Sequence, residues 1–118
     1  MVKRMLNQSA ALDLTFQALG DQTRRRIVAR LARGEASVSE LARPLAMSLP
    51  AVMQHLAMLE GAGLVRSRKV GRVRTCRINP RTLSLAERWI NQRRSEWEHR
   101  LDQLGEYLET LKTEGEQK

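Results

Sequence analysis

One stretch, residues 48–78, decides the fold; its sequence is SLPAVMQHLAMLEGAGLVRSRKVGRVRTCRI. In its first half, Val52, Leu56 and Leu59 follow the spacing i, i+4, i+7, which predicts a helix with one apolar face. Its second half is rich in β-branched residues and arginine and contains a single glycine, which predicts a β-hairpin. The stretch therefore predicts a helix that is followed directly by a two-stranded hairpin.

Local signals set the bounds of these two elements. Ser48 is a favoured N-cap residue, so we expect the helix over about residues 48–61. The hairpin is expected over about residues 64–78, with Val70 and Gly71 between its strands. A helix fits the major groove of DNA, and a basic hairpin beside it can hold phosphates, so this pair of elements favours DNA binding.

Periodicity predicts four further helices. They are expected over residues 9–19, over 22–32 with Asp21 as N-cap, over a short segment capped by Ser37 or Ser39, and over about 82–111. The last of them repeats an apolar residue every seven positions, as a coiled coil does. We therefore predict a mainly α fold with a small β-hairpin wing, a winged helix-turn-helix, in a single domain of residues 1–118.

The charge of the chain points to a polyanionic partner. The chain has 118 residues with 21 Lys+Arg against 13 Asp+Glu, a formal net charge of +8. The expected hairpin contains six basic residues and no acidic one: Arg66, Arg68, Lys69, Arg72, Arg74 and Arg77. Self-repulsion on so short a segment requires an anion to offset it, and nucleic acid is the first candidate.

Composition excludes several other classes. A single cysteine rules out an intrachain disulfide, and no apolar run approaches a membrane span, so we expect a cytoplasmic protein without a membrane partner. Two histidines and one cysteine offer no nucleophile–base pair, and we therefore expect no enzyme activity and no cofactor. Two functions stay open: a sequence-specific DNA-binding regulator, and a winged-helix module that binds another protein.

Candidate DNA contacts lie on the expected recognition helix. Gln54 and Met53 are predicted to point away from its apolar face, where Gln bonds adenine and Met contacts a thymine methyl. Ser48 and Ala51 lie at the helix N-terminus, which favours a phosphate, although Ser48 also serves as a cap. His55 is either a structural hydrogen-bonding residue or a DNA contact.

Other candidate contacts are cationic. In the hairpin, the best residues for phosphates or the minor groove are Arg68, Lys69, Arg72 and Arg74. Arg66 and Arg77 are alternatively expected to pair with acids on neighbouring helices. Arg24 and Arg25 are either DNA-backbone contacts or solvated charges.

Ordered motifs along the chain resemble the ArsR/SmtB family of winged-helix transcriptional regulators. They are Leu19-Gly20-Asp21-Gln22-Thr23-Arg24-Arg25-Arg26-Ile27, Ser39-Glu40-Leu41-Ala42, Met47-Ser48-Leu49-Pro50-Ala51-Val52, His55-Leu56 and Leu59-Glu60-Gly61-Ala62-Gly63-Leu64-Val65. The resemblance implies a homodimer that represses a promoter and releases it on a signal, such as a small-molecule effector. It also implies a dimer interface from the first and last helices, for which the candidates are Leu12, Phe16, Leu83, Ile90, Trp97, Leu101, Leu104 and Leu108.

The metal-sensing branch of that family is not matched. Its thiol motif is replaced here by Ser37-Val38-Ser39, and the last helix has His99 and Asp102 without a second histidine, so no metal site is expected. Cys76 is either a small core residue or a redox sensor that neighbouring arginines activate. Trp89 and Trp97 line a ligand cavity or anchor the dimer.

Overall fold

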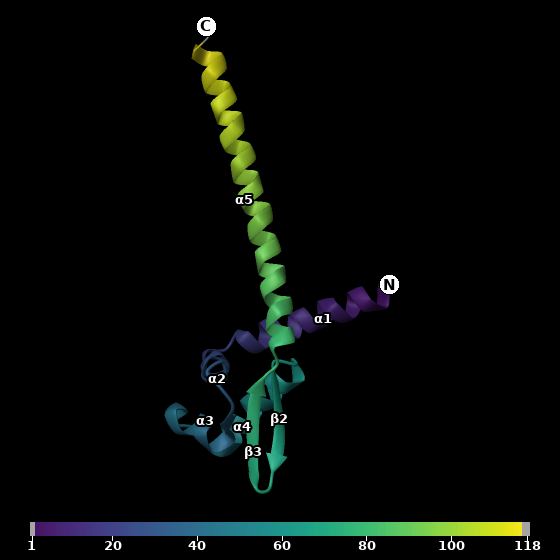
Figure 1. The fold of residues 1–118 in the computed structure, drawn as a ribbon, viewed down its shortest axis with the longest axis vertical. Helices are drawn as coiled ribbons and strands as arrows, with labels where there is room; N and C mark the ends of the chain where they lie inside the picture. Colours follow the sequence, from purple (N-terminus) through teal and green to yellow (C-terminus); the bar gives the residue numbers. More distant parts are fainter. Residues whose placement is uncertain (1, 117–118) are drawn as a thin grey trace. The chain divides into compact units, whose positions relative to one another are not determined.

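The computed structural model describes residues 2–116, with side chains from residue 9 onward (Figure 1). The chain forms two compact units, one that ends at Ala86 and one that begins at Glu87. In order, the elements are α1 (Val2–Leu19), α2 (Gln22–Leu31), β1 (Ala36–Ser37), α3 (Val38–Leu45), α4 (Leu49–Gly61), β2 (Val65–Val70), β3 (Val73–Ile78) and α5 (Pro80–Glu116). The predicted fold class, mainly α with a small β-hairpin wing, is confirmed.

The helix-turn-helix consists of α3 and α4. Val52, Leu56 and Leu59 of α4 are buried in the core of the first unit, as their spacing predicted. Of the two serines proposed as the cap of α3, Ser37 is the one whose hydroxyl accepts from a helix N–H, that of Glu40, at 3.1 Å. The two helices are therefore placed by a shared apolar core and by a cap at the start of α3.

The turn between α3 and α4 begins at a strained residue and ends at a cap. Ala46 follows α3 with φ +52° and ψ +38°, a left-handed conformation that glycine adopts with less strain. The hydroxyl of Ser48 then accepts from the Ala51 N–H at 3.3 Å and starts α4. Only three residues, 46–48, therefore separate the end of α3 from the start of α4.

Both terminal helices are longer than predicted. The expected start of α1 at Ser9 is wrong, since the helix begins at Val2 and no Gly or Pro interrupts residues 2–8. The expected start of α5 at Thr82 is also wrong, because Pro80 occupies the first helical position, where its missing N–H costs nothing. At its other end α5 runs to Glu116 and thus past the predicted end near Leu111.

The hairpin of β2 and β3 forms the wing, residues 65–78, and it belongs to a three-stranded antiparallel sheet in the order β1-β3-β2. The sequence did not predict β1, because two residues cannot show an alternating pattern. Ala36 of β1 pairs with Cys76, so this short strand ties the wing to the loop before α3. The tip of the wing extends beyond the helices of its unit (Figure 1).

The turn of the wing lies one residue later than expected. Val70 pairs with Val73, which leaves Gly71 and Arg72 as the two turn residues. Gly71 has φ +63°, as a two-residue hairpin turn of type II′ requires at its first central position. The predicted turn of Val70 and Gly71 is therefore wrong, and Arg72 lies at the tip of the wing rather than in a strand.

The second unit is the part of α5 that begins at Glu87. Its large apolar side chains are exposed, among them Ile90, Trp97, Leu101, Leu104, Leu108 and Leu111. A helix whose apolar residues recur every seven positions and remain exposed has the pattern of one strand of a coiled coil. Among the described helices, none has a stretch apolar and long enough to cross a bilayer.

Candidate nucleic-acid interface

The wing places like charges directly opposite each other. Arg66 faces Arg77 across the two strands, and Lys69 faces Arg74. Cross-strand pairs of like charge destabilise a hairpin, so the wing contains two locally unfavourable pairs. A polyanion bound to the wing would offset this repulsion.

The two pairs lie on opposite faces of the wing. Side chains alternate along a strand, so Lys69 and Arg74 share a face with the buried Cys76, the face that packs toward the core and α4. Arg66 and Arg77 lie on the other face, together with Arg68 and Thr75. The pair formed by Lys69 and Arg74 is therefore the one on the same side of the hairpin as the recognition helix.

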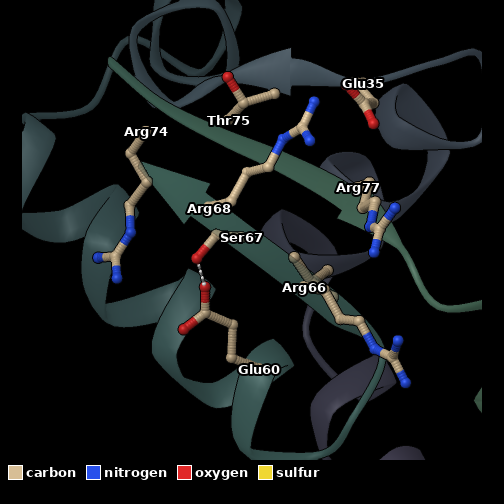
Figure 2. Close-up of a pocket in the computed structure, with 9 residues that line it drawn as sticks. Glu35, Glu60, Arg66, Ser67, Arg68, Arg74, Thr75 and Arg77 are labelled. Carbon is tan, nitrogen blue, oxygen red and sulfur yellow. Dashed lines mark hydrogen bonds between the residues drawn. The ribbon is translucent and has the colours of Figure 1, made fainter. Parts of the chain in front are cut away.

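The wing cations have no acidic partners within the described part of the chain. A cleft of about 430 Å³ brings Glu35 and Glu60 near Arg66 and Arg77, but no carboxylate lies within ion-pair distance of a wing cation there (Figure 2). The alternative that Arg66 and Arg77 pair with acids is wrong. Glu60 of α4 instead accepts a hydrogen bond from the Ser67 hydroxyl, and this contact joins the recognition helix to the wing.

The residues predicted on α4 fall into two groups. Ser48 and Gln54 are exposed and Ala51 is half-buried, so these three remain candidates for contact with DNA. Met53 is half-buried and packs against the core cluster, so the prediction that it points away from the apolar face is wrong, while its contact with DNA stays a prediction. A long flexible thioether fills space beside a core even where the helical period places it at the margin, and sequence spacing does not reveal this.

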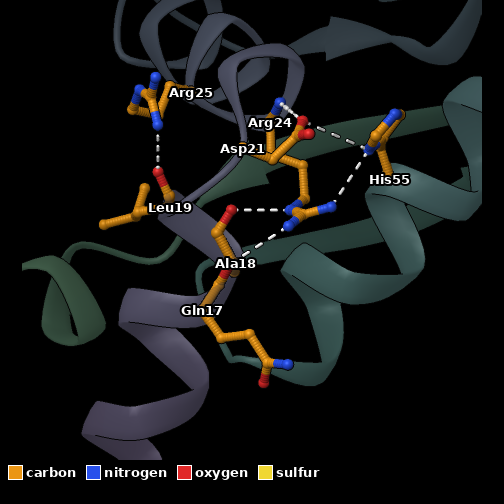
Figure 3. Close-up of polar contacts among 7 residues, drawn as sticks. All are labelled: Gln17, Ala18, Leu19, Asp21, Arg24, Arg25 and His55. Carbon is orange, nitrogen blue, oxygen red and sulfur yellow. Dashed lines mark hydrogen bonds and ion pairs between the residues drawn. The ribbon is translucent and has the colours of Figure 1, made fainter.

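Arg24 and Arg25 bind the end of α1. Arg24 donates from Nε to the Ala18 carbonyl at 2.7 Å, and Arg25 donates from Nη1 to the Leu19 carbonyl at 2.8 Å (Figure 3). The last carbonyls of a helix lack intrahelical partners and carry partial negative charge, so cations stabilise them. This capping role is neither of the two interpretations that the sequence offered for these arginines.

Asp21 begins α2 and also faces the recognition helix. Its Oδ2 accepts from the Arg24 N–H at 3.0 Å and lies 3.8 Å from Nδ1 of His55. The bond from the Arg24 backbone is the main cause that lowers the pKa of the Asp21 carboxyl, and the positive charge of Arg24 adds to it. The carboxylate is therefore the favoured form of this N-cap.

Removal of the Asp21 cap should lower stability in a pH-dependent way. We expect Asp21→Ala to lower the melting temperature by a few degrees and Asp21→Asn to lower it less, because Asn also caps helices. Since the folded pKa lies below the unfolded one, the charge stabilises the fold above the unfolded pKa, and this contribution is lost as the pH falls through the folded pKa. Thermal unfolding monitored by circular dichroism at pH 7 and at pH 3 measures both effects. A difference between wild type and Asp21→Asn that does not shrink at pH 3 would contradict the role of the charge.

Cys76 is fully buried beneath the wing. Burial raises the pKa of its thiol, Glu60 adds to the rise, and Arg74 opposes it. Arg77, which was expected to activate the thiol, lies on the opposite face of the strand. The structure therefore supports the interpretation of Cys76 as a small core residue over that of a redox sensor.

Comparison with known proteins places this geometry in a family. A family model described as a helix-turn-helix domain matches residues 19–68. The HTH-type transcriptional regulator Rv2034 of Mycobacterium tuberculosis is 50% identical over 72 residues, which cover 61% of this chain and 67% of the relative. The crystal structure of an ArsR family transcriptional regulator is similar with a TM-score of 0.69 and 44% identity, over 78% of this chain and 92% of the other. The chain belongs to the ArsR family.

A second solved structure bears on the assembly of ArsR-family proteins. It is the homodimeric winged helix-turn-helix DNA-binding domain of a possible ArsR-family regulator from Mycobacterium bovis. Its TM-score is 0.60 at 28% identity, over 82% of this chain and 88% of the other. The predicted resemblance and the predicted class of transcriptional regulator are thus confirmed.

The residues predicted at the dimer interface of this ArsR-family chain are placed on both terminal helices. On α1, Leu12 is half-buried and Phe16 is 36% exposed, and on α5 Leu83 packs against the core of the first unit. The remaining five are exposed on α5: Ile90, Trp97, Leu101, Leu104 and Leu108. Within the described residues, no three His, Cys, Asp or Glu side chains gather closely enough to hold a metal ion.

The two tryptophans of α5 lie on its surface. Trp97 is 61% exposed and lines a shallow hollow with side chains of the same helix. The guanidinium of Arg93 lies over the ring of Trp89, with its Cζ 4.8 Å from the ring centroid. This arrangement is a cation–π contact on one helix, and a ligand cavity lined by the two tryptophans near a dimer interface stays a prediction.

Proposed function

We propose that this ArsR-family chain is a homodimeric repressor that binds a pseudo-palindromic DNA operator through α4 and the wing. The observation that carries the proposal is the wing, in which two like-charge pairs face each other without an acidic partner in the described residues. A phosphate backbone supplies the missing negative charge. The bound dimer would repress transcription by occupying the promoter.

Contacts are divided between base edges and phosphates. Gln54 is exposed on α4, and its amide has the donor and acceptor that match adenine N7 and N6 in the major groove. At the helix start, beside Ala51, the exposed Ser48 hydroxyl and the positive end of the helix dipole would face a phosphate. On the wing, phosphates would be held by Arg68, Lys69, Arg72 and Arg74.

The dimer would form through the exposed apolar stripe of α5 together with Leu12 and Phe16 of α1. Two copies of a heptad stripe bury each other in a coiled coil, which accounts for leucines such as Leu101 and Leu108 on a helix surface. A two-fold dimer presents two copies of α4, and these read half-sites about 10 bp apart or a multiple of that distance.

Substitution of Gln54 tests the reading of bases. We expect Gln54→Ala to weaken binding to the operator by about 5- to 100-fold for each half-site while binding to scrambled DNA stays the same, because a bidentate contact to one base carries about 1–3 kcal/mol of discrimination. Fluorescence anisotropy on the DNA upstream of the protein's own gene, over a salt series, measures both affinities.

Gln103→Ala, exposed on α5 and outside the proposed contacts with DNA, serves as the control. A loss of affinity that is equal on operator and scrambled DNA would contradict base reading by Gln54. Absence of wild-type binding at low salt would reject DNA as the partner and favour a protein ligand for the wing.

A further inference from the structure

Arg24 connects the end of α1 to the recognition helix. Its Nε donates to the Ala18 carbonyl at 2.7 Å and its Nη2 to the Gln17 carbonyl at 3.2 Å. Its Nη1 lies 3.4 Å from Nδ1 of His55, which is 31 residues later on α4. All three nitrogens of the guanidinium are therefore engaged within the protein, as Figure 3 shows.

The two carbonyl bonds hold the guanidinium in place. A guanidinium is planar, so two bonds from one edge determine where the third nitrogen points. Here that nitrogen, Nη1, points to the ring of His55 (Figure 3). The position of the donor is thus determined by the end of α1 and does not depend on His55 itself.

This contact selects one tautomer of the His55 ring. A guanidinium only donates hydrogen bonds, so a neutral imidazole that faces it must present a lone pair at Nδ1 and carry its proton at Nε2. Asp21 favours the opposite tautomer, since its Oδ2 lies 3.8 Å from the same Nδ1 and only accepts. Arg24 and Asp21 therefore compete for one ring nitrogen, and Arg24 is the nearer of the two.

We propose that Arg24 is a positioning residue that holds His55 as the Nε2–H tautomer and thereby gives α4 a hydrogen-bond donor for DNA. In Figure 3 the second ring nitrogen of His55 points away from Arg24 and Asp21. Every acceptor that DNA offers there, a phosphate oxygen or a purine N7 or O6, matches an N–H and is repelled by a lone pair. This inference rests on the proposed function, and it assigns to Arg24 an indirect role in place of a direct contact with the DNA backbone.

The tautomer is measurable without DNA. Long-range ¹H–¹⁵N spectra of the full chain at pH 8, where an ordinary imidazole is neutral, distinguish protonated from unprotonated ring nitrogens. We expect the Nε2–H form for His55, and exposed His99 serves as an internal reference. A wild-type spectrum with the proton on Nδ1 of His55 would overturn the proposal, and this outcome requires no variant to fold.

Substitution of Arg24 tests the cause of the tautomer. We expect Arg24→Met to shift the His55 proton toward Nδ1, which then donates to Asp21. Arg25→Met is the matched control, since Arg25 also binds an α1 carbonyl but does not contact His55. An unchanged His55 spectrum in a folded Arg24→Met variant would overturn the role of Arg24.

DNA binding then tests the consequence. We expect Arg24→Met to weaken operator binding about 10-fold for each half-site, the value of one hydrogen bond to a charged group, and Arg25→Met to change it less than about 2-fold. In a His55→Gln background the effect of Arg24→Met should fall below about 2-fold, whereas a purely structural effect would persist there at full size and contradict the proposal. Absence of DNA binding by a wild type with the expected tautomer would reject the proposed function and leave the assignment of the tautomer intact.

Discussion

The double substitution Leu101→Asp with Leu108→Asp should convert the proposed dimer into a monomer and abolish tight DNA binding. The two leucines lie seven residues apart on α5 and are 48% and 55% exposed in the single chain. In a coiled-coil dimer each would be buried against its counterpart, where two unpaired carboxylates repel each other and lose their hydration. We expect operator affinity to fall by more than about 100-fold, since the two half-sites no longer bind as one unit.

The assembly is measured by sedimentation equilibrium. The variant should have the mass of one chain, 13.5 kDa, and the wild type twice that mass. Gln103→Asp with Thr110→Asp is the matched control, because these residues have the same spacing and the same change of charge but lie off the apolar stripe. A variant at Leu101 and Leu108 that remains dimeric would show that the stripe is not the interface.

Lys69→Gln with Arg74→Gln should weaken DNA binding strongly and at the same time stabilise the fold. The pair lies on the face of the wing toward α4, so a dimer would lose four phosphate contacts. We expect the slope of log K against log salt to fall by about 3 to 4, which corresponds to an affinity loss of about 1,000-fold at physiological salt. Removal of the cross-strand repulsion should raise the free energy of unfolding by about 0.5 kcal/mol.

The second like-charge pair provides the control for this prediction. Arg66→Gln with Arg77→Gln removes the same charge and a similar repulsion but lies on the opposite face. We expect a similar gain in stability and an affinity loss of less than about 10-fold, because only the diffuse attraction changes. Equal losses of affinity in the two double variants would contradict specific contacts by the face toward α4. Anisotropy titrations and chemical denaturation measure the two quantities.

Local signals explain how much of the fold was predictable. Asp21, Ser37 and Ser48 each cap the helix that follows, because the cap bond joins residues three positions apart. The predicted apolar face of α4, formed by Val52, Leu56 and Leu59, was also correct, because its spacing follows from the helical repeat. The composition of residues 64–78 predicted a basic wing. The predicted turn was one residue too early, because the sequence does not reveal that Val70 pairs with Val73.

The candidate site was less predictable, because its key contacts join distant parts of the chain. Nothing near Arg24 in the sequence indicates His55, and nothing near Glu60 distinguishes Ser67 as its partner. The partial burial of Met53 likewise depends on neighbours from other elements.

By itself, the sequence determined the class of fold, the helix caps, the heptad stripe of α5 and the positive charge of the wing. These properties depend on residue type and on spacings of a few residues, which the backbone geometry of a helix or strand makes regular. Only the tertiary structure decided that Lys69 and Arg74 share the face of α4, that Arg24 caps α1 and reaches His55, and that Cys76 is buried. Those outcomes depend on strand register and on the packing of separate elements, and neither is encoded in any local pattern.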